Sequence, residues 1–320
     1  MDGKRIAPEP HTTLILNVSK NVKRTQPYNS TMTMDNKICF ITGANSGIGK
    51  AAAIQLAQLG FYVLIGSRNK ERGLLAVTEI KDKSKSDLVE LIEIDMSLKA
   101  SILNATKQIK NKFKKLDVLI HNAADFDLSI KKPIQTKEGI ETIWATNHIG
   151  PVVLTNNLMD LIKQSEQGRI ITVASQGLML HPKLTIDFKD PEYKTRSFSV
   201  SKAYYQSKLA QVMYTYWLAK KLSDTSITVN CVRVTNVKID ITRYPNLSGL
   251  MKFMYSIKRK FSISPDEMAK TYTYLATSTD LKMTTGKYFN EKNRIVDSSP
   301  YSKNFKNIEE LMILTTKYIE

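Results

Sequence analysis

The sequence TGANSGIGK occupies residues 42–50. It begins at the end of a short apolar run at residues 37–42 and leads into a helical pattern over residues 47–59. A strand, a glycine-rich turn and a helix in this order can bind a dinucleotide, because glycines let the backbone approach a pyrophosphate at the positive end of the helix. A Walker loop would need glycine and a hydroxyl residue where Ile48 and Ala51 stand, which disfavours ATP. A turn that serves only backbone geometry is the alternative. The residues expected to contact the cofactor are Gly43, Asn45, Ser46, Gly47, Ile48 and Gly49.

Short apolar runs alternate with longer amphipathic segments along the rest of the chain. The predicted strands cover residues 37–42, 62–66, 88–94, 116–121, 168–174, 226–232 and 287–289. The predicted helices cover residues 47–59, 70–81, 100–113, 138–163, 200–222 and 265–278. This alternation predicts an α/β fold with a parallel sheet. We expect one domain over residues 35–320 and a disordered extension over residues 1–34.

The composition is that of an ordinary globular protein with a strong positive charge. Of the 320 residues, 42% are hydrophobic, which is ample for a packed core. Lys plus Arg exceed Asp plus Glu by 47 minus 30, or 17, which favours anionic partners such as a phosphorylated cofactor or anionic lipid. This charge is spread along the chain without a dense basic tract, so nucleic-acid binding is disfavoured. The 4 histidines are scattered without ligand spacing, so no metal site is expected.

Two features of the sequence bear on the cellular compartment of the protein. Cys39 and Cys231 each lie in an apolar run, which indicates reduced thiols and a reducing compartment such as the cytoplasm. Residues 11–33 contain no acidic side chain, and they fit a disordered extension that precedes a natural start at Met32 or Met34, an organellar targeting peptide, or a partner-binding arm. No segment reaches the roughly 18 apolar residues that a membrane-spanning helix needs.

The end of the second predicted strand indicates which dinucleotide is preferred. An enzyme that uses NAD usually has Asp or Glu here to bind the ribose 2′-hydroxyl, whereas this chain has Ser67, Arg68 and Asn69. The Arg68 guanidinium can bind a 2′-phosphate, with Ser67 and Asn69 as further donors, so NADP(H) is favoured over NAD. The alternative is that Arg68 is a surface residue that caps the next helix.

A candidate acid/base pair lies in the predicted helix at residues 200–222. Tyr204 and Lys208 are four residues apart, which places them on one helix face. A lysine cation within a few ångström favours the phenolate form of the tyrosine, so the pair can act as an acid/base near neutral pH. Taken alone, a solvated tyrosine beside a surface lysine explains the same spacing.

Further motifs accompany these in a fixed order. GSRNKERG stands at residues 66–73, HNAA at 121–124, TNHIG at 146–150, AYYQSKLA at 203–210 and TGKYFNE at 285–291, and Ser175 follows ITVA. Over residues 37–300 the chain resembles the short-chain dehydrogenase/reductase family, and within it the retinol dehydrogenase-like branch. The resemblance implies a single Rossmann domain with a seven-stranded parallel sheet in the order 3-2-1-4-5-6-7. In that order two strands separate Cys39 from Cys231, about 14 Å at normal strand spacing, which excludes a disulfide between them.

The resemblance also implies the roles of individual residues. It maps a catalytic tetrad onto Asn147, Ser175, Tyr204 and Lys208. Tyr204 would transfer the proton to or from the substrate oxygen and Ser175 would position that oxygen. Lys208 would keep the phenol acidic and bind the nicotinamide ribose, and Asn147 would anchor a water for the proton relay. The remaining cofactor contacts would be Asp95 and Met96 beside the adenine, and Asn122 and Ala123 along the cleft.

Structural alternatives stand beside three of these assignments. Asp95 can cap the following helix, Asn147 can hold a kink in the backbone, and Ser175 can close a turn. The chain also departs from the family pattern after its sixth predicted strand, where relatives carry Pro-Gly and a threonine that contacts the cofactor. Here the sequence is VTNV at residues 234–237, and Val237 is expected to contact the nicotinamide through its backbone.

Residues 240–264 correspond to the substrate lid of relatives. An apolar face between residues 247 and 257, together with nearby lysine and arginine side chains, suits either a lid over an apolar substrate or a contact with an anionic membrane surface. The sequence therefore predicts an NADP(H)-dependent oxidoreductase that interconverts an alcohol and a carbonyl on a retinoid-, steroid- or lipid-like molecule. The alternative is an NADPH-binding regulatory or scaffold protein of the same fold with little turnover. A homodimer is left open.

Overall fold

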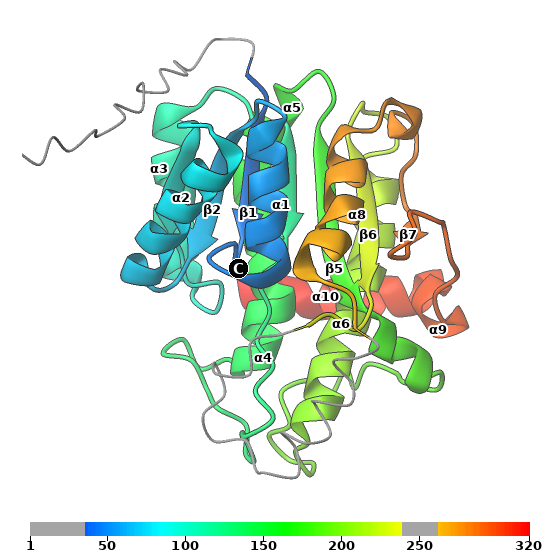
Figure 1. Ribbon diagram of the computed structural model, residues 1–320. Helices are drawn as coiled ribbons and strands as arrows, with labels where there is room; N and C mark the ends of the chain where they lie inside the picture. The colour runs from blue at the N-terminus through cyan, green and yellow to red at the C-terminus, as the bar shows by residue number, and fades with distance from the viewer. Residues whose placement is uncertain (1–35, 239–261) are drawn as a thin grey trace, which may run out of the picture.

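The computed structural model describes residues 36–238 and 262–320. The predicted extension at residues 1–34 and nearly all of the predicted lid at residues 240–264 therefore lie outside the described residues. The other predicted elements fall within them, and Figure 1 shows their arrangement.

A seven-stranded parallel sheet forms the centre of the domain. Its order is β3-β2-β1-β4-β5-β6-β7, which confirms the predicted topology. Most of its side chains are buried, as expected of strands that helices cover on both faces, and the edge strand β3 is the least buried. The strands are β1 (Ile38–Thr42), β2 (Tyr62–Ser67), β3 (Val89–Glu93), β4 (Val118–His121), β5 (Arg169–Ser175), β6 (Thr228–Val234) and β7 (Tyr288–Phe289).

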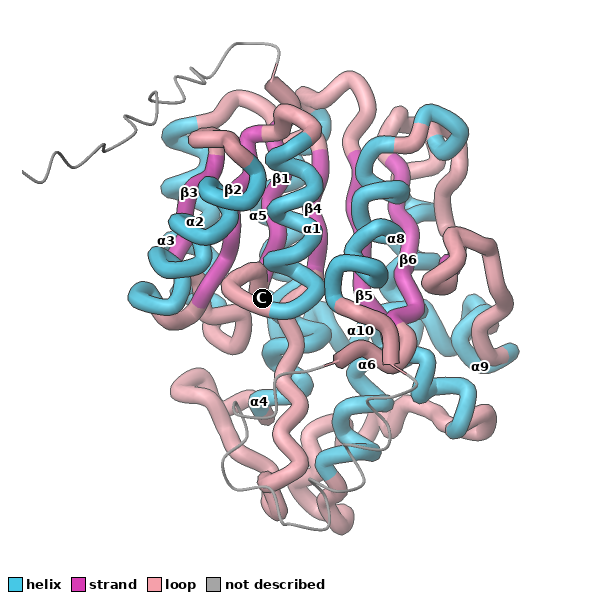
Figure 2. Tube along the Cα trace, in the orientation of Figure 1, coloured by secondary structure: helices cyan, strands magenta, loops and turns pink. Residues whose placement is uncertain are grey.

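Each face of the sheet has its own apolar core. On one face the core includes side chains of α1 (Gly47–Gln58), α2 (Lys70–Ser84) and α8 (Pro265–Thr277). On the other face it includes side chains of α3 (Lys99–Lys112), α5 (Gly150–Lys163), α6 (Val200–Lys221) and α10 (Phe305–Ile319). In Figures 1 and 2, α1 and α8 lie in front of the sheet, while α4 (Thr142–Trp144) and the start of α6 extend below the carboxyl ends of the strands.

The predicted helix at residues 138–163 is wrong at its start. The helix begins at Thr142, because the Glu141 carboxylate accepts hydrogen bonds from the backbone N–H groups of Ile143 (3.0 Å) and Trp144 (2.8 Å) and so caps the chain there. It then passes through a π-helical segment, η1 (Ala145–Ile149), before α5. A single 3.6-residue periodicity does not describe this stretch, because a π turn inserts one residue and shifts the helix face of the residues after it.

Two helices at the C-terminal end were missing from the sequence prediction. They are α9 (Pro300–Lys303) and α10. Ile308, Leu311, Met312 and Thr315 of α10 are buried at the i, i+3, i+4, i+7 spacing of an amphipathic helix, a signal that was present in the sequence. The helix covers the face of the sheet on which α6 lies, so it supports the helix that carries the candidate acid/base pair.

The two cysteines lie as predicted. Cys39 in β1 and Cys231 in β6 are buried free thiols, and β4 and β5 separate their strands. Within residues 36–238 and 262–320, no helix is both long and apolar enough to cross a membrane.

Candidate functional site

The glycine turn joins β1 to α1 at the carboxyl edge of the sheet. Gly43 (φ 64°) and Gly47 (φ 59°) adopt left-handed backbone conformations that disfavour a side chain. Ser46 is the N-cap residue of α1, yet its side chain makes no capping hydrogen bond, and the first turn has no acidic residue. Neither the cap residue nor the first turn of α1 thus neutralises the positive end of the helix, which suits a bound phosphate. Asn45 and Ile48 complete the turn and are partly buried.

Asn122, just beyond β4, holds this turn in place. Its Nδ2 donates hydrogen bonds to the carbonyl oxygens of Thr42 (2.9 Å) and Gly43 (3.1 Å). The backbone N–H of Ala123 donates to Thr42 Oγ1 at 3.0 Å. A Cβ atom on Gly49 would lie 2.4 Å from Asn122 Nδ2, so only glycine leaves room for the amide at that position.

The end of β2 presents Arg68 at the surface. Ser67 is buried and its hydroxyl donates to the carbonyl oxygen of Asn69 at 2.9 Å, while Asn69 Oδ1 accepts from the backbone N–H of Arg72 at 2.8 Å and caps α2. Asn69, not Arg68, is therefore the helix cap. Burial raises the pKa of the Asp125 carboxyl, and the positive charge of Arg68 opposes this rise.

Asp95 and Met96 follow β3 in a tight turn. Asp95 Oδ1 accepts hydrogen bonds from the backbone N–H (2.9 Å) and the hydroxyl (2.7 Å) of Ser97, so this carboxylate holds the turn before α3. The Met96 side chain is buried in the core. The Met96 carbonyl oxygen would lie 2.1 Å from a Cβ atom on Gly150, so α5 can start here only with glycine. The turn has a structural role that does not conflict with a cofactor contact.

Ser175 ends β5, where the sheet meets the loop after β6. Its Oγ accepts a hydrogen bond from the backbone N–H of Gly177 at 3.2 Å and caps the short helix η2 (Gln176–Leu180). The accepting oxygen keeps its proton for donation. Thr235 Oγ1 donates to Gln176 Oε1 at 2.5 Å, which ties the altered loop after β6 to the residue beside Ser175. Val237 pairs with Ile263 in a parallel bridge, just before α8.

Asn147 lies in the π turn of η1 and is almost completely buried. Its Nδ2 donates to the carbonyl oxygen of Asp125 (3.1 Å) and to Ser207 Oγ (3.0 Å), while its Oδ1 accepts from the backbone N–H of Asp125 (2.7 Å). Asn147 therefore joins the loop after β4 to α6. These bonds agree with the structural alternative that Asn147 stabilises a kink.

Tyr204 and Lys208 lie on one face of α6. The Lys208 ammonium nitrogen is 5.7 Å from the centre of the Tyr204 ring, within the range of a cation–π interaction. It donates a 2.8 Å hydrogen bond to the carbonyl oxygen of Val173 in β5. Lys208 is buried, and this burial lowers the pKa of its ammonium group to about 8. Tyr204 is half-buried, and Phe126 stacks on its ring with the ring centres 4.2 Å apart.

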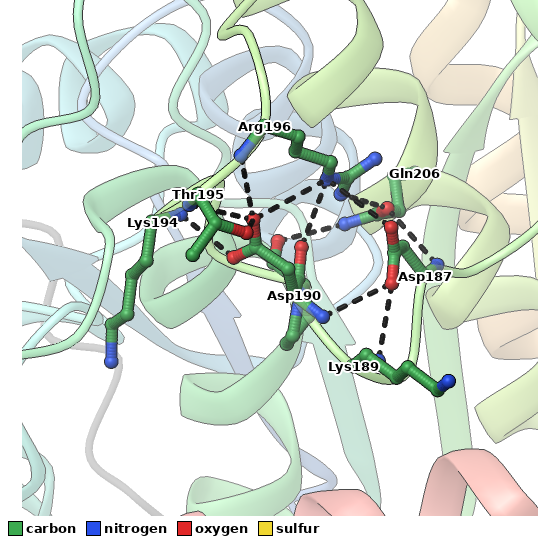
Figure 3. A network of polar contacts seen from close by, with 8 residues as sticks. Asp187, Lys189, Asp190, Lys194, Thr195, Arg196 and Gln206 are labelled. Carbon is green, nitrogen blue, oxygen red and sulfur yellow. Dashed lines mark hydrogen bonds and ion pairs between the residues drawn. The ribbon is translucent and has the colours of Figure 1, made fainter.

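A polar network fixes the loop that precedes α6 (Figure 3). The Asp190 carboxylate accepts hydrogen bonds from the backbone N–H groups of Lys194 (2.7 Å), Thr195 (2.9 Å) and Arg196 (3.1 Å). Arg196 in turn donates to Gln206 Oε1 at 2.8 Å. Gln206 lies between Tyr204 and Lys208 in the sequence of α6. The loop is therefore anchored to the helix that carries the acid/base pair.

The sequence reasoning missed three contributors to this site. Phe126 covers the Tyr204 ring, Thr42 bonds the Ala123 backbone, and Gln206 anchors the loop before α6. Gln206 lies in the motif AYYQSKLA and Thr42 begins TGANSGIGK, so the sequence motifs could have indicated both residues. Phe126 carried no signal, because an aromatic residue in a loop does not indicate which ring it will contact.

Comparison with known proteins agrees with this geometry. The family model "short chain dehydrogenase" matches residues 37–184. Retinol dehydrogenase 13 of Homo sapiens is 32% identical over 81% of this chain and 78% of its own length. Retinol dehydrogenase 12 of Mus musculus is 34% identical over 86% of this chain and 84% of its own length. A crystal structure of a putative uncharacterized protein from Mycobacterium paratuberculosis has the same fold, with a TM-score of 0.66 and 22% identity over 91% of this chain and 96% of that one.

The chain belongs to the short-chain dehydrogenase/reductase family, and it is an oxidoreductase that acts on CH–OH groups. Within that family it lies in the retinol dehydrogenase-like branch. Both statements confirm the resemblance inferred from the motifs.

Proposed function

We propose that the protein is an NADP(H)-dependent oxidoreductase that interconverts an apolar alcohol and the corresponding aldehyde or ketone, with Tyr204 as the acid/base. The observation that carries the proposal is the position of Tyr204 and Lys208 on one face of α6, beside the end of β5 where Ser175 lies. The glycine turn that suits a dinucleotide begins at the same edge of the sheet. Proton transfer and nucleotide binding thus share one end of the fold, as the reaction requires.

NADPH held by the glycine turn and Arg68 would supply the hydride that reduces the carbonyl carbon of the substrate. The Tyr204 hydroxyl donates its proton to the carbonyl oxygen, which becomes the hydroxyl of the product. The Ser175 hydroxyl donates a hydrogen bond to the same oxygen and orients it. The Lys208 cation favours the phenolate that remains on Tyr204, and Asn147 holds η1 against α6. The phenolate then regains a proton from solvent.

The preference for NADP(H) is supported by Arg68. Its side chain is exposed at the end of β2, on the edge of the sheet where the glycine turn lies, and Asn69 rather than Arg68 caps α2. A guanidinium in this position can make paired hydrogen bonds to a 2′-phosphate. No acidic residue occupies the three positions from Ser67 to Asn69, where an acidic side chain would bind a ribose 2′-hydroxyl.

The substrate class is supported by the relatives and by the surroundings of Tyr204. The relatives named above are retinol dehydrogenases, and retinol is an apolar alcohol. Around the phenol, Phe126 and Tyr205 contribute aromatic surface. An apolar alcohol or carbonyl would therefore bury its apolar surface against these rings, which favours its binding.

The test measures the oxidation of NADPH by its absorbance, with retinal, decanal and other apolar aldehydes and ketones as candidate substrates. We expect turnover with at least one of them and a loss of at least about a hundredfold in Tyr204→Phe. Tyr205→Phe is the matched control, because Tyr205 is the next residue on α6 and is also half-buried. Binding of NADPH without turnover across the panel would contradict the proposal and favour a regulatory NADPH-binding protein.

A further inference from the structure

Tyr272 of α8 lies completely buried against the residue that holds the glycine turn. Its hydroxyl donates a hydrogen bond to Asn122 Oδ1 at 3.2 Å, across 150 residues of sequence. Burial raises the pKa of the Tyr272 phenol well above its usual value, so the phenol keeps the proton that it donates.

The other hydrogen bonds of Asn122 explain how this contact affects the glycine turn. The amide nitrogen faces two carbonyl oxygens, those of Thr42 and Gly43, so the amide oxygen must point the opposite way. In that direction it meets the Tyr272 hydroxyl. Without this donor, the partly buried amide oxygen would lose the Tyr272 hydroxyl, and the amide could not recover by turning over, because its oxygen would then face two other oxygens.

The segment just before α8 contacts the loop after β6. Just before α8, the backbone N–H of Ile263 donates to the carbonyl oxygen of Asn236 at 3.0 Å, and the N–H of Lys238 donates to the carbonyl oxygen of Ile263 at 2.9 Å. The loop that lacks the Pro-Gly pair is thus tied to α8. Tyr272 follows Ile263 by nine residues, and most of that interval is helix, so α8 and the residues just before it join the two loops.

We propose that Tyr272 is a positioning residue for the pyrophosphate of the cofactor, acting through Asn122 on the carbonyl oxygens of Thr42 and Gly43. The inference rests on the proposed nucleotide site. It concerns the pyrophosphate, which NADPH and NADH share, and so it does not depend on the preference that Arg68 confers.

The experiment is calorimetric or fluorescence titration of Tyr272→Phe with NADPH, NADH and 2′-phospho-ADP-ribose. We expect each Kd to rise by about five- to tenfold, by the same factor for all three probes, because all contain the pyrophosphate. Substrate turnover at saturating cofactor should stay within about twofold of the wild type. Tyr274→Phe, two residues further along α8 and half-buried, should leave every Kd unchanged.

A double variant separates positioning from general destabilisation. If Tyr272 acts through Asn122, adding Tyr272→Phe to Asn122→Ala should change the Kd for NADPH by less than about twofold. Additive effects would overturn the inference, and so would a single variant that is folded and binds all three probes like the wild type. Failure of the wild type to bind NADPH or NADH would instead overturn the proposed function together with this inference. Binding of NADH alone would overturn only the preference for NADP(H).

Discussion

Lys208 Nζ donates a 2.8 Å hydrogen bond to the carbonyl oxygen of Val173, two residues before Ser175 in β5. This bond fixes α6 against the strand that carries Ser175, so the distance between the proposed acid/base and its oxygen-orienting partner is set by the core. The ammonium group is buried at this position, and burial lowers its pKa to about 8. The lysine is consequently poised to lose its charge just above neutral pH in the protein without cofactor.

The stability of the protein should therefore depend on pH through Lys208. Between about pH 8 and its usual pKa of 10.5, this lysine binds a proton in the unfolded chain and not in the folded one, so stability increases with pH. From about pH 7.5 to 10, the free energy of unfolding of the wild type should rise by about 2 kcal/mol relative to Lys208→Met. Urea unfolding of both proteins at several pH values measures this difference, and parallel pH profiles would contradict it.

Substitution of Arg68 should change the cofactor preference. In Arg68→Ala, the Kd for NADPH should rise by about thirty- to a hundredfold, because the 2′-phosphate loses a charge-assisted pair of hydrogen bonds. The Kd for NADH should change by less than about threefold. Arg72→Ala serves as the control, since Arg72 is exposed on the first turn of α2. Equal effects of Arg68→Ala on both cofactors would refute the assignment.

Asn147 should contribute to stability even without cofactor. Asn147→Ala leaves the partly buried backbone groups of Asp125 without their Asn147 partners, and we expect a loss of about 2–3 kcal/mol in the free energy of unfolding. Ser207→Ala removes the bond between Asn147 and α6, together with the bond from Ser207 Oγ to the Tyr204 carbonyl oxygen within α6, and should cost about 1 kcal/mol. Chemical denaturation compares the two. A loss in Asn147→Ala no larger than that in Ser207→Ala would show that the bonds to Asp125 contribute nothing.

The network in Figure 3 should respond to acid. Partial burial acts to raise the pKa of the Asp190 carboxyl, but the hydrogen bonds from Thr195, Lys194 and Arg196 prevail and lower it to about 2. The stabilisation is therefore complete above about pH 4 and is lost as the pH falls through 2. Asp190→Asn should lower the melting temperature by several degrees at pH 7, and this deficit should shrink toward pH 2. A deficit that is constant from pH 7 to pH 2 would argue against an ionised Asp190.

Much of the fold followed from local patterns. The seven strands and their order were predicted, because apolar runs mark buried strands and the motifs identify the topology. The start of the helix at Thr142 was not, since it depends on the Glu141 side chain and on a π turn rather than on periodicity. The helix α10 was overlooked although its apolar spacing was visible. For the site, the sequence indicated the glycine turn, Arg68 and the Tyr204–Lys208 pair, and the roles of these residues stay predictions until they are tested.

The sequence by itself determined which residues can do chemistry here and how neighbours in the chain relate. Glycines at positions 43 and 47 allow a left-handed turn, and four-residue spacing places Tyr204 and Lys208 on one helix face, because both depend only on local backbone geometry. Only the tertiary structure decided that Lys208 is buried against β5 and that Tyr272 meets Asn122. Such contacts join residues far apart in the chain, so they depend on how helices pack on the sheet, and no local propensity encodes that packing.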